Sequence, residues 1–254
     1  MSGIDRRQFL ARALTAGGAF LLGGCDRLSQ SVWFPKVLDS AEFLNRTVQR
    51  ALTPRDALAT EFPESYISPV FRPNGSTDPQ NPAYRALAAG GFRDYRLEVR
   101  GLVEHPMSLS LDELRALPSR TQITRHDCVE GWSVIGKWKG ARLSALLDRV
   151  QPLPAARYVM FHCADTLGSS DARYYESIDM LDAYHPQTIL AYELNDRTVP
   201  IENGAPLRVR IERQLGYKMA KYIMAIELVE SFVDIKGGKG GYWEDRGYEW
   251  YAGI

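Results

Sequence analysis

The stretch RHDCVEGWSVIGKWKGARLSALL, residues 125–147, places Cys128 among charged and aromatic neighbours. The chain has three cysteines, of which Cys128 and Cys163 lie beyond the N-terminal segment. These two thiols allow three interpretations: a disulfide, which an oxidising compartment permits, two unpaired buried residues, or a thiolate ligand to a soft or high-valent metal. Taken alone, the cysteines favour the disulfide. The choice among the three interpretations therefore depends on the sequence segments around them.

The first 25 residues, MSGIDRRQFLARALTAGGAFLLGGC, have the composition of an export signal. Arg6 and Arg7, followed by Gln-Phe-Leu, fit the twin-arginine pattern, whose transport route carries proteins that have already folded. The apolar run at 13–22 is shorter than the ~20 residues that a membrane-spanning helix needs. We therefore expect a periplasmic protein that folds, and receives any cofactor, in the cytoplasm.

The end of this segment, LLGGC, resembles a lipobox, the motif at which lipoprotein signals are cleaved. In that interpretation Cys25 becomes a lipidated N-terminus that anchors the protein to a membrane. The alternative is an ordinary small-residue cleavage region in which the cysteine is incidental. The sequence leaves both interpretations open.

Residues 26–60 are expected to form a linker and an amphipathic helix, because apolar residues recur at helical spacing from Val37 to Leu52. Residues 61–254 are long enough for one domain with a sizeable core. Lysine plus arginine (31) balances aspartate plus glutamate (31), so the charge gives no support for a nucleic-acid partner. A small ligand or a protein partner is expected.

The domain is predicted to be α+β, with mixed β-sheets and short helices, because no regular βαβ alternation appears. Residues 62–82 are predicted to form a long packed loop, and Ser110 with Glu113 predicts a capping box for a short helix. A second helix is predicted near 142–150. Strands are predicted at 95–103, 120–125, 157–163, 188–193, 206–212 and 223–230.

Most familiar catalytic motifs are absent from the sequence, including a Walker loop, a dinucleotide-binding glycine fingerprint, HExxH and G-x-S-x-G. No CxxCH motif is present, so no haem is expected. The GGKGG cluster at 237–241 is interpreted either as a cradle for an anion or, preferably, as a flexible joint. The four histidines have no metal-finger spacing.

The segment 125–147 resembles the metal-binding segment of the sulfite oxidase family, in particular its periplasmic branch of methionine-sulfoxide reductases. The resemblance rests on an Arg-x-x-Cys-Val-Glu-x-Trp-Ser pattern, a Trp-x-Gly and a leucine-rich helix. A second segment, HPQTILAYELNDRTVPIENGAPLRVRIERQLGYKMAKYI (185–223), resembles the cofactor-binding stretch of the same family. The resemblance extends, with gaps, from Phe71 to Val229 and implies a sulfite-oxidase-type molybdopterin-binding fold.

The resemblance implies roles for individual residues. Cys128 matches the cysteine whose sulfur binds molybdenum, which is otherwise held by one molybdopterin and by oxo groups. Positions that match the family's pterin- and phosphate-binding stretch are Asn203, Arg208, Met219, Ala220 and Lys221. The guanidinium of Arg208 and the ammonium of Lys221 suit a terminal phosphate, although both residues could instead be charges on a solvated strand and turn.

The segment VFRPNG in the long loop resembles a family segment only in part. We expect cofactor contacts there from Phe71, Arg72, Asn74 and Gly75; the alternative is that these residues merely close the loop.

Two positions depart from the family pattern. Cys163 replaces a threonine or an aspartate at a position that lies near the metal in the family. A second sulfur there would either tune the reduction potential of the metal or be inert. Asp127 replaces an arginine of the sulfoxide-reductase branch. Both departures weaken the inference that this chain acts on the same substrate as members of the family. Candidates for a proton donor in the pocket are Tyr184, His185 and Tyr192.

The sequence therefore predicts a periplasmic molybdenum-dependent oxidoreductase, with its molybdopterin-binding domain at 61–254. It would transfer an oxygen atom in a two-electron step, by sulfoxide reduction or sulfite-type oxidation of a small molecule. Electrons would pass singly to or from a separate redox partner, for which a membrane cytochrome is expected. The competing hypothesis is a non-enzymatic periplasmic binding module of the same fold, in which Cys128 and Cys163 form a disulfide.

Overall fold

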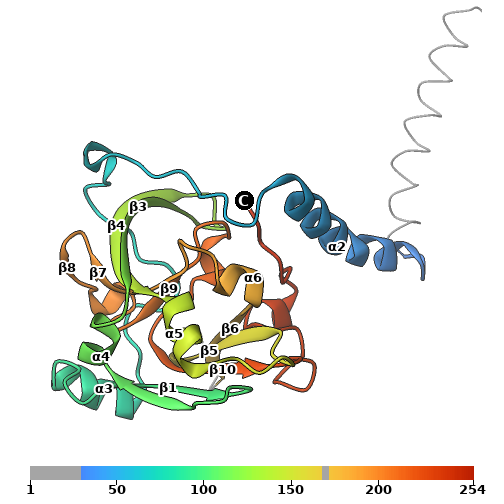
Figure 1. Cartoon of the computed structure of the whole chain (residues 1–254). Helices are drawn as coiled ribbons and strands as arrows, with labels where there is room; N and C mark the ends of the chain where they lie inside the picture. Colours follow the sequence, from blue (N-terminus) through green and yellow to red (C-terminus); the bar gives the residue numbers. More distant parts are fainter. Residues whose placement is uncertain (1–29, 168–171) are drawn as a thin grey trace, which may run out of the picture. The chain divides into compact units, whose positions relative to one another are not determined.

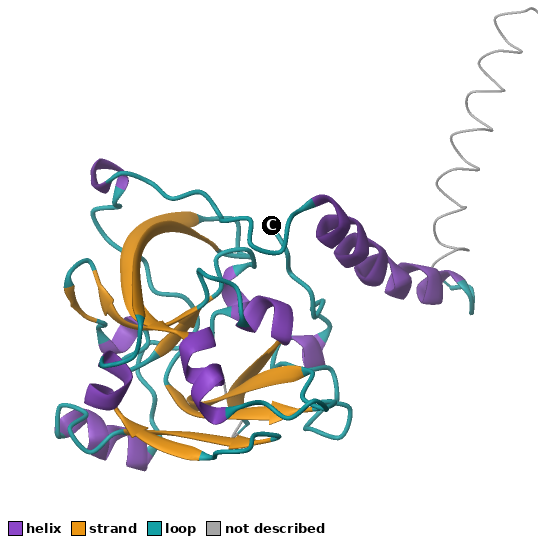
Figure 2. Ribbon diagram, in the orientation of Figure 1, coloured by secondary structure: helices purple, strands orange, loops and turns teal. Residues whose placement is uncertain are grey.

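Two five-stranded β-sheets form the framework of the described part of Thr53–Ile254 (Figures 1 and 2). The computed structural model describes residues 30–167 and 172–254. Sheet A has the strand order β3-β4-β7-β8, with β9 paired to β7. All its pairings are antiparallel. Its strands are β3 (Ser119–Asp127), β4 (Ser133–Arg142), β7 (Ile189–Leu194), β8 (Arg197–Thr198) and β9 (Arg208–Arg210).

Sheet B has the order β2-β1-β10-β5-β6 and is mixed, because β1 and β10 run parallel while its other pairs are antiparallel. Its strands are β1 (Arg96–Gly101), β2 (Met107–Ser110), β5 (Tyr158–Thr166), β6 (Arg173–Asp179) and β10 (Ile223–Val229). The α+β class with mixed sheets and short helices is thereby confirmed.

Short helices connect these strands. The helices are α3 (Pro82–Ala89), α4 (Leu111–Arg115), α5 (Leu143–Val150) and α6 (Met180–Ala183), with 3₁₀ turns η1 (Glu64–Tyr66), η2 (Ile201–Asn203), η3 (Gly216–Lys218) and η4 (Glu244–Arg246). The predicted capping box of α4 is present: Ser110 Oγ accepts from the Glu113 amide at 3.2 Å, and the Glu113 carboxylate accepts from the Ser110 amide at 2.7 Å. Both contacts satisfy amides that the first helical turn leaves unpaired.

The main hydrophobic core joins the two sheets. Helix α5 turns Leu143, Leu146, Leu147 and Val150 inward, and these side chains belong to one cluster with residues of β1, β5 and β10 from sheet B and of β7 and β9 from sheet A. A smaller cluster is centred on Trp138 of β4, which is fully buried. The packed sheets hold the ends of β3, β9 and β10 in fixed positions, and the candidate site is built from those ends.

Six of the helices and strands were not predicted: α3, α6, β2, β4, β6 and β8. Helix α3 carried a readable signal, since Asn81 caps it by accepting from the Tyr84 amide at 3.1 Å and Pro82 occupies the first turn. In β4, glycines at 136 and 140 lower the strand propensity. Gly140 is required there because a Cβ would lie 2.3 Å from the Leu190 carbonyl oxygen of the neighbouring strand.

The loop at 62–82 is packed only in part. Phe71 is buried, whereas Tyr66 and Val70 are exposed. The Ser68 amide donates to the Ile135 carbonyl at 3.0 Å, which ties the loop to β4.

The described residues 30–52 belong to a separate unit, whose described element is α2 (Phe34–Leu52). This helix confirms the amphipathic helix expected from the apolar spacing. Its first turn is capped by Ser31, whose hydroxyl accepts from the Phe34 amide at 3.1 Å. Over the described residues, no helix combines the length and apolar character needed to cross a membrane. The twin arginine and Cys25 lie outside the described residues.

Candidate active site

Cys128 is the first residue of the tight loop that joins β3 to β4. Its amide donates to the Trp132 carbonyl at 2.9 Å, and its carbonyl accepts from the Gly131 amide at 3.0 Å. Gly131 has a φ of +84°, a conformation that favours glycine. Because β3 and β4 are paired up to Asp127 and Ser133, the loop holds the thiol at a defined position at the end of the hairpin.

The Cys128 side chain lines a cavity of about 120 Å³. Four other predicted residues line the same cavity: Asn74, Gly75, Met219 and Lys221. The rest of the wall is formed by Ser76, Val129, Glu130, Asp165, Leu167, Tyr174, Gly216, Tyr217, Trp243 and Tyr248. The structure therefore brings the loop at 71–76, the hairpin tip and the turn at 216–221 together, although they are far apart in the sequence.

Two oxygen atoms in this wall are buried without a hydrogen-bond partner among the described residues: Asn74 Oδ1 and Asp165 Oδ1. The other Asp165 oxygen accepts from the Ser76 hydroxyl at 2.6 Å. Burial raises the pKa of Asp165. Buried polar atoms are normally paired, so these two oxygens mark positions where a bound molecule would complete the site. The sequence contained no signal for Asp165.

Arg208 and Lys221 bring two buried positive charges to the back of the site. Arg208 Nη1 donates to the Asn203 carbonyl at 2.8 Å, while its Nε has no partner among the described residues. Lys221 Nζ donates to the carbonyls of Asn74, Ser76 and Glu202. No carboxylate of the described chain forms an ion pair with either residue.

Burial lowers the pKa of Lys221 to about 7 and that of Arg208 to about 9; the neighbouring Arg208 adds to the shift of Lys221, and Arg210 to that of Arg208. Gly204 lies against both side chains, since a Cβ there would be 3.0 Å from Lys221 Cβ and 3.2 Å from Arg208 Cβ. A buried charge is costly unless an opposite charge compensates it. The pair therefore fits a bound anion such as a phosphate.

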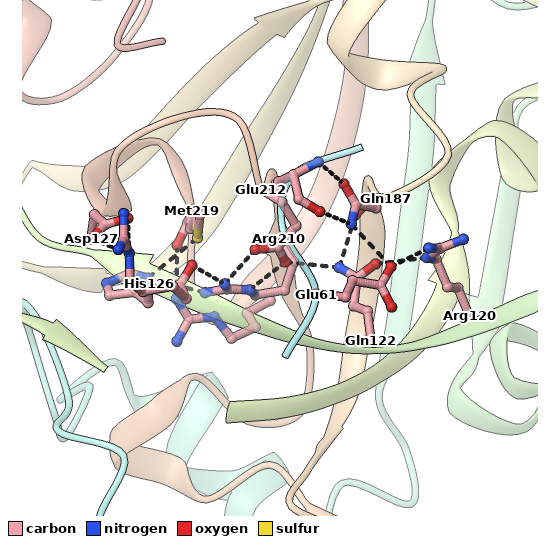
Figure 3. Close-up of polar contacts among 12 residues, drawn as sticks. Glu61, Arg120, Gln122, His126, Asp127, Gln187, Arg210, Glu212 and Met219 are labelled. Atoms are coloured by element: carbon pink, nitrogen blue, oxygen red, sulfur yellow. Dashed lines mark hydrogen bonds and ion pairs between the residues drawn. The ribbon is translucent and has the colours of Figure 1, made fainter. Parts of the chain in front are cut away.

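Arg210, two residues along β9, has a different environment (Figure 3). Its guanidinium forms a two-point ion pair with buried Glu212, at 2.7 Å and 2.9 Å. It also donates to His126 Nδ1 at 3.0 Å. Burial, together with the charge of Arg210, holds the pKa of His126 well below its ordinary value.

His126 connects this network to the hairpin that carries Cys128. Its ring lies 5.9 Å from that of Phe71 and 5.8 Å from that of Trp132. Gly216 packs against it so closely that a Cβ would be 2.4 Å from His126 Nε2. That nitrogen has no partner among the described residues. Neither His126 nor Arg210 was among the site residues predicted from the sequence.

The remaining predicted residues lie behind or beside the cavity. Asn203 is buried, and its Nδ2 donates to the Phe71 carbonyl at 3.3 Å. Ala220 is part of the main core, and its carbonyl accepts from the Val209 amide at 3.0 Å, which fixes the turn between Met219 and Lys221. Arg72 is exposed, with its guanidinium 4.7 Å from the Trp132 ring.

Cys163 does not line the Cys128 cavity. It lines a neighbouring cavity of about 930 Å³ on sheet B, with which the first shares Tyr174. Both cysteines are free thiols, so the disulfide of the competing hypothesis is not formed in the described structure. Burial raises the pKa of both, and more strongly that of the fully buried Cys163.

Three suggested proton donors are likewise absent from the lining of the Cys128 cavity. Tyr192 is buried in the main core, and Tyr184 is exposed at the end of α6. His185 Nε2 lies 3.0 Å from the Ala57 carbonyl. None of the three lines this cavity, so the structure gives no support to the suggestion.

The backbone amides of the GGKGG cluster bind an anionic group of the same chain, the Asp245 carboxylate. The amides of Gly237 and Lys239 donate to the Asp245 carboxylate at 3.1 and 3.2 Å. The preferred interpretation as a flexible joint was therefore wrong. The cradle fixes the C-terminal segment, which brings the stacked pair Trp243 and Tyr248 to the wall of the Cys128 cavity, with ring centroids 5.2 Å apart.

Comparisons with known proteins agree with this geometry. The family described as oxidoreductase molybdopterin binding domain matches residues 86–234. A protein of Azospira oryzae, provisionally named protein-methionine-sulfoxide reductase subunit YedZ1, is 42% identical over 253 residues, which cover 98% of this chain and 87% of that protein.

Two catalytic subunits MsrP of protein-methionine-sulfoxide reductases match a shorter region. That of Ralstonia nicotianae is 38% identical over 165 residues, and that of Xanthomonas axonopodis pv. citri is 37% identical over 163 residues. Each alignment covers 61% of this chain, which spans about half the length of these two relatives (49% and 50%).

Among solved structures, the sulfane dehydrogenase SoxCD from Paracoccus pantotrophus is similar, with a TM-score of 0.50 and 20% identity over 57% of this chain and 40% of that one. This likeness concerns the fold. Together with the family match over residues 86–234, these findings show that the chain belongs to the sulfite oxidase family of molybdopterin-binding proteins and is a molybdenum-dependent oxidoreductase.

Proposed function

We propose that the chain is the catalytic subunit of a periplasmic sulfoxide reductase, in which a two-electron oxygen-atom transfer takes place at a molybdenum held by Cys128. The observation that carries the proposal is the pair Arg208 and Lys221, two neighbouring buried cations that form no ion pair within the described chain. Lys221 lines the same cavity as Cys128. Sulfoxide reduction is favoured over sulfite-type oxidation because the curated relatives are named for it.

The residues of the site fit a single molybdopterin-bound molybdenum. Cys128 would supply the protein sulfur ligand, and a thiolate remains a strong donor through a two-electron change at a metal. Arg208 and Lys221 would bind the terminal phosphate, while Asn203 and Met219 hold the surrounding turns. When bound, this cofactor supplies the oxygen-atom and electron-transfer chemistry.

Reduction of a sulfoxide to a sulfide consumes two electrons and two protons and releases water. Asp165 is the titratable carboxyl group in the cavity wall whose pKa burial raises. Its Oδ1 has no partner among the described residues, so it is placed to hold and transfer a proton. The aromatic rings of Tyr217, Trp243 and Tyr248 would limit the access of water to the cavity.

Electrons would arrive one at a time from a separate redox partner, and a membrane cytochrome is the proposed carrier. The twin arginine supports export of the folded, cofactor-loaded protein to the periplasm. Attachment to a membrane through a lipid on Cys25 remains the alternative to a soluble mature form.

The test is the metal content and turnover of the purified protein. We expect one molybdenum and one pterin per chain, and reduction of methionine sulfoxide with a reduced viologen dye as electron donor. Cys128→Ser is the control and should be inactive. A protein without stoichiometric molybdenum would contradict the proposal, and turnover of sulfite alone, with an oxidising dye, would contradict its direction.

A further inference from the structure

Helix α2 has an apolar face that no other element packs against within the described residues 30–52 of its own unit. Residues that recur at helical spacing form this face: Val37, Ala41, Leu44, Val48 and Leu52. The four larger side chains are between 51% and 80% exposed. A face of this kind normally packs against an apolar partner.

The opposite side of α2 is polar and carries mixed charge. The sequence of the helix contains three basic residues (Lys36, Arg46 and Arg50) and two acidic ones (Asp39 and Glu42). Thr47 bonds back to its own helix, since its hydroxyl donates to the Phe43 carbonyl at 2.7 Å. The exception on this side is Phe43, whose ring lies 5.9 Å from the Arg46 guanidinium. The helix is therefore amphipathic and carries only a small net charge.

We infer that the apolar face of α2 binds the surface of a phospholipid bilayer, with the helix lying in the plane of the membrane. A helix of 19 residues is about 28 Å long, but it is too polar to cross a bilayer. A large apolar stripe opposite a charged face is typical of helices that insert only to the headgroup boundary.

The sequence that precedes α2 supports this partner. Phe34 lies nine residues after Cys25, so even a fully extended chain separates them by at most about 30 Å. If Cys25 carries a lipid, α2 must therefore lie close to the bilayer. One acyl chain gives only marginal membrane binding, and a second attachment such as an amphipathic helix makes it stable.

Trp33 provides a further argument. It lies directly before α2 and is exposed, with its ring 5.7 Å from that of Phe34. Tryptophan is enriched at the boundary between headgroups and acyl chains, because its ring is apolar while its N–H can still form a hydrogen bond. A pair of aromatic rings at one end of the apolar face suits that boundary.

The inference does not depend on the proposed substrate, although it would hold the enzyme close to a membrane-bound electron carrier. Because the helix carries little net charge, hydrophobic burial rather than attraction to anionic lipid provides the binding. Binding should therefore persist at high ionic strength, where screening weakens an electrostatic contact.

The test is amide hydrogen exchange of the purified, molybdenum-loaded full chain, with and without protein-free vesicles of phosphatidylethanolamine and phosphatidylglycerol. We expect exchange in residues 34–52 to slow on addition of vesicles. Leu44→Glu with Val48→Glu should weaken this protection about tenfold or more, because two apolar side chains no longer enter the bilayer. The matched control, Thr47→Glu with Gln49→Glu, adds the same charge outside the apolar face and should remain protected.

Molybdenum content and turnover with a soluble donor should be unchanged in both double variants, which separates this inference from the proposed function. The inference is overturned if vesicles leave exchange in 34–52 unchanged, or if both variants respond alike. It is also overturned if the helix is protected without vesicles, which indicates docking within the chain. Protection only by native, protein-containing membranes would indicate a protein partner instead.

Discussion

Arg208 and Arg210 both place their guanidinium groups over the ring of Trp138, at 5.0 and 4.9 Å, but only Arg210 has a carboxylate partner. The two side chains come from the same short strand and are fully buried. Glu212 forms an ion pair with Arg210, whereas Arg208 forms no ion pair within the described chain. This difference separates a structural arginine from one that is available to a ligand.

Arg208→Met should lower the molybdopterin content while leaving the fold intact. A hydrogen bond to a charged group is worth about 1.5–3 kcal/mol, which corresponds to a ten- to hundredfold loss of affinity. In the cofactor-free protein the same change removes a buried charge that forms no ion pair within the described chain. The temperature of thermal unfolding should therefore not decrease. Pterin content after dialysis is the measurement, and undiminished content would contradict the assignment.

Arg210→Met is the matched comparison. It leaves Glu212 buried without its ion-pair partner, and breaking a buried pair in this way costs about 3–5 kcal/mol. We expect a clear loss of stability in the cofactor-free protein, measured by denaturant unfolding. If Arg208→Met and Arg210→Met destabilise the protein equally, the distinction between the two arginines is wrong.

Lys221 should make the stability of the cofactor-free protein depend on pH. Its pKa is about 7 in the folded protein and ~10.4 in an unfolded chain. Between these values the unfolded state binds more protons than the folded state. The contribution of Lys221 to the free energy of unfolding therefore increases as pH rises from about 7 towards ~10, and this increase is lost as pH falls back through about 7. Lys221→Met should remove this contribution.

The measurement for Lys221 is the free energy of unfolding as a function of pH, compared between the cofactor-free wild type and Lys221→Met. Lys221→Met should be more stable than the wild type at the low-pH end of this window, and this excess stability should decrease as pH rises through it. Parallel curves would show that Lys221 keeps its ordinary pKa and that its site is more solvated than the structure indicates.

Cys128→Ser should abolish turnover, whereas Cys163→Ser should retain substantial activity and bound metal. Serine offers a harder and less acidic oxygen in place of the thiolate, so even a retained metal would have an altered potential and paramagnetic spectrum. Cys163 lines a different cavity, and its replacement should affect only packing. Similar behaviour of the two variants in metal content and activity would refute the assignment of Cys128.

Replacement of Arg6 and Arg7 by lysine should keep the molybdenum-loaded protein out of the periplasm, because the twin-arginine route is the one that carries folded proteins. Cell fractionation followed by metal analysis of the periplasmic protein tests this. An unchanged amount of molybdenum protein in the periplasm would show that export does not use this signal.

Local patterns in the sequence predicted several elements correctly, because their determinants are close together in the chain. The capping box of Ser110 and Glu113 acts across three residues, and α5 follows from apolar spacing alone. Strand β4 was missed because its glycines are required by contacts with other parts of the fold. At position 140 only glycine fits, because the backbone of Leu190, which is distant in sequence, leaves no room for a Cβ. Signals of that kind cannot be read locally.

The sequence by itself determined the family and singled out Cys128, Arg208 and Lys221 as candidate ligands, because the resemblance is carried by contiguous segments. Only the tertiary structure decided that Cys128 and Lys221 line one cavity while Cys163 lines another. It also showed that Asp165 belongs to the cavity wall and that Arg208, unlike Arg210, forms no ion pair within the described chain. These properties depend on burial and on partners that only folding brings together, and a residue's type does not encode them.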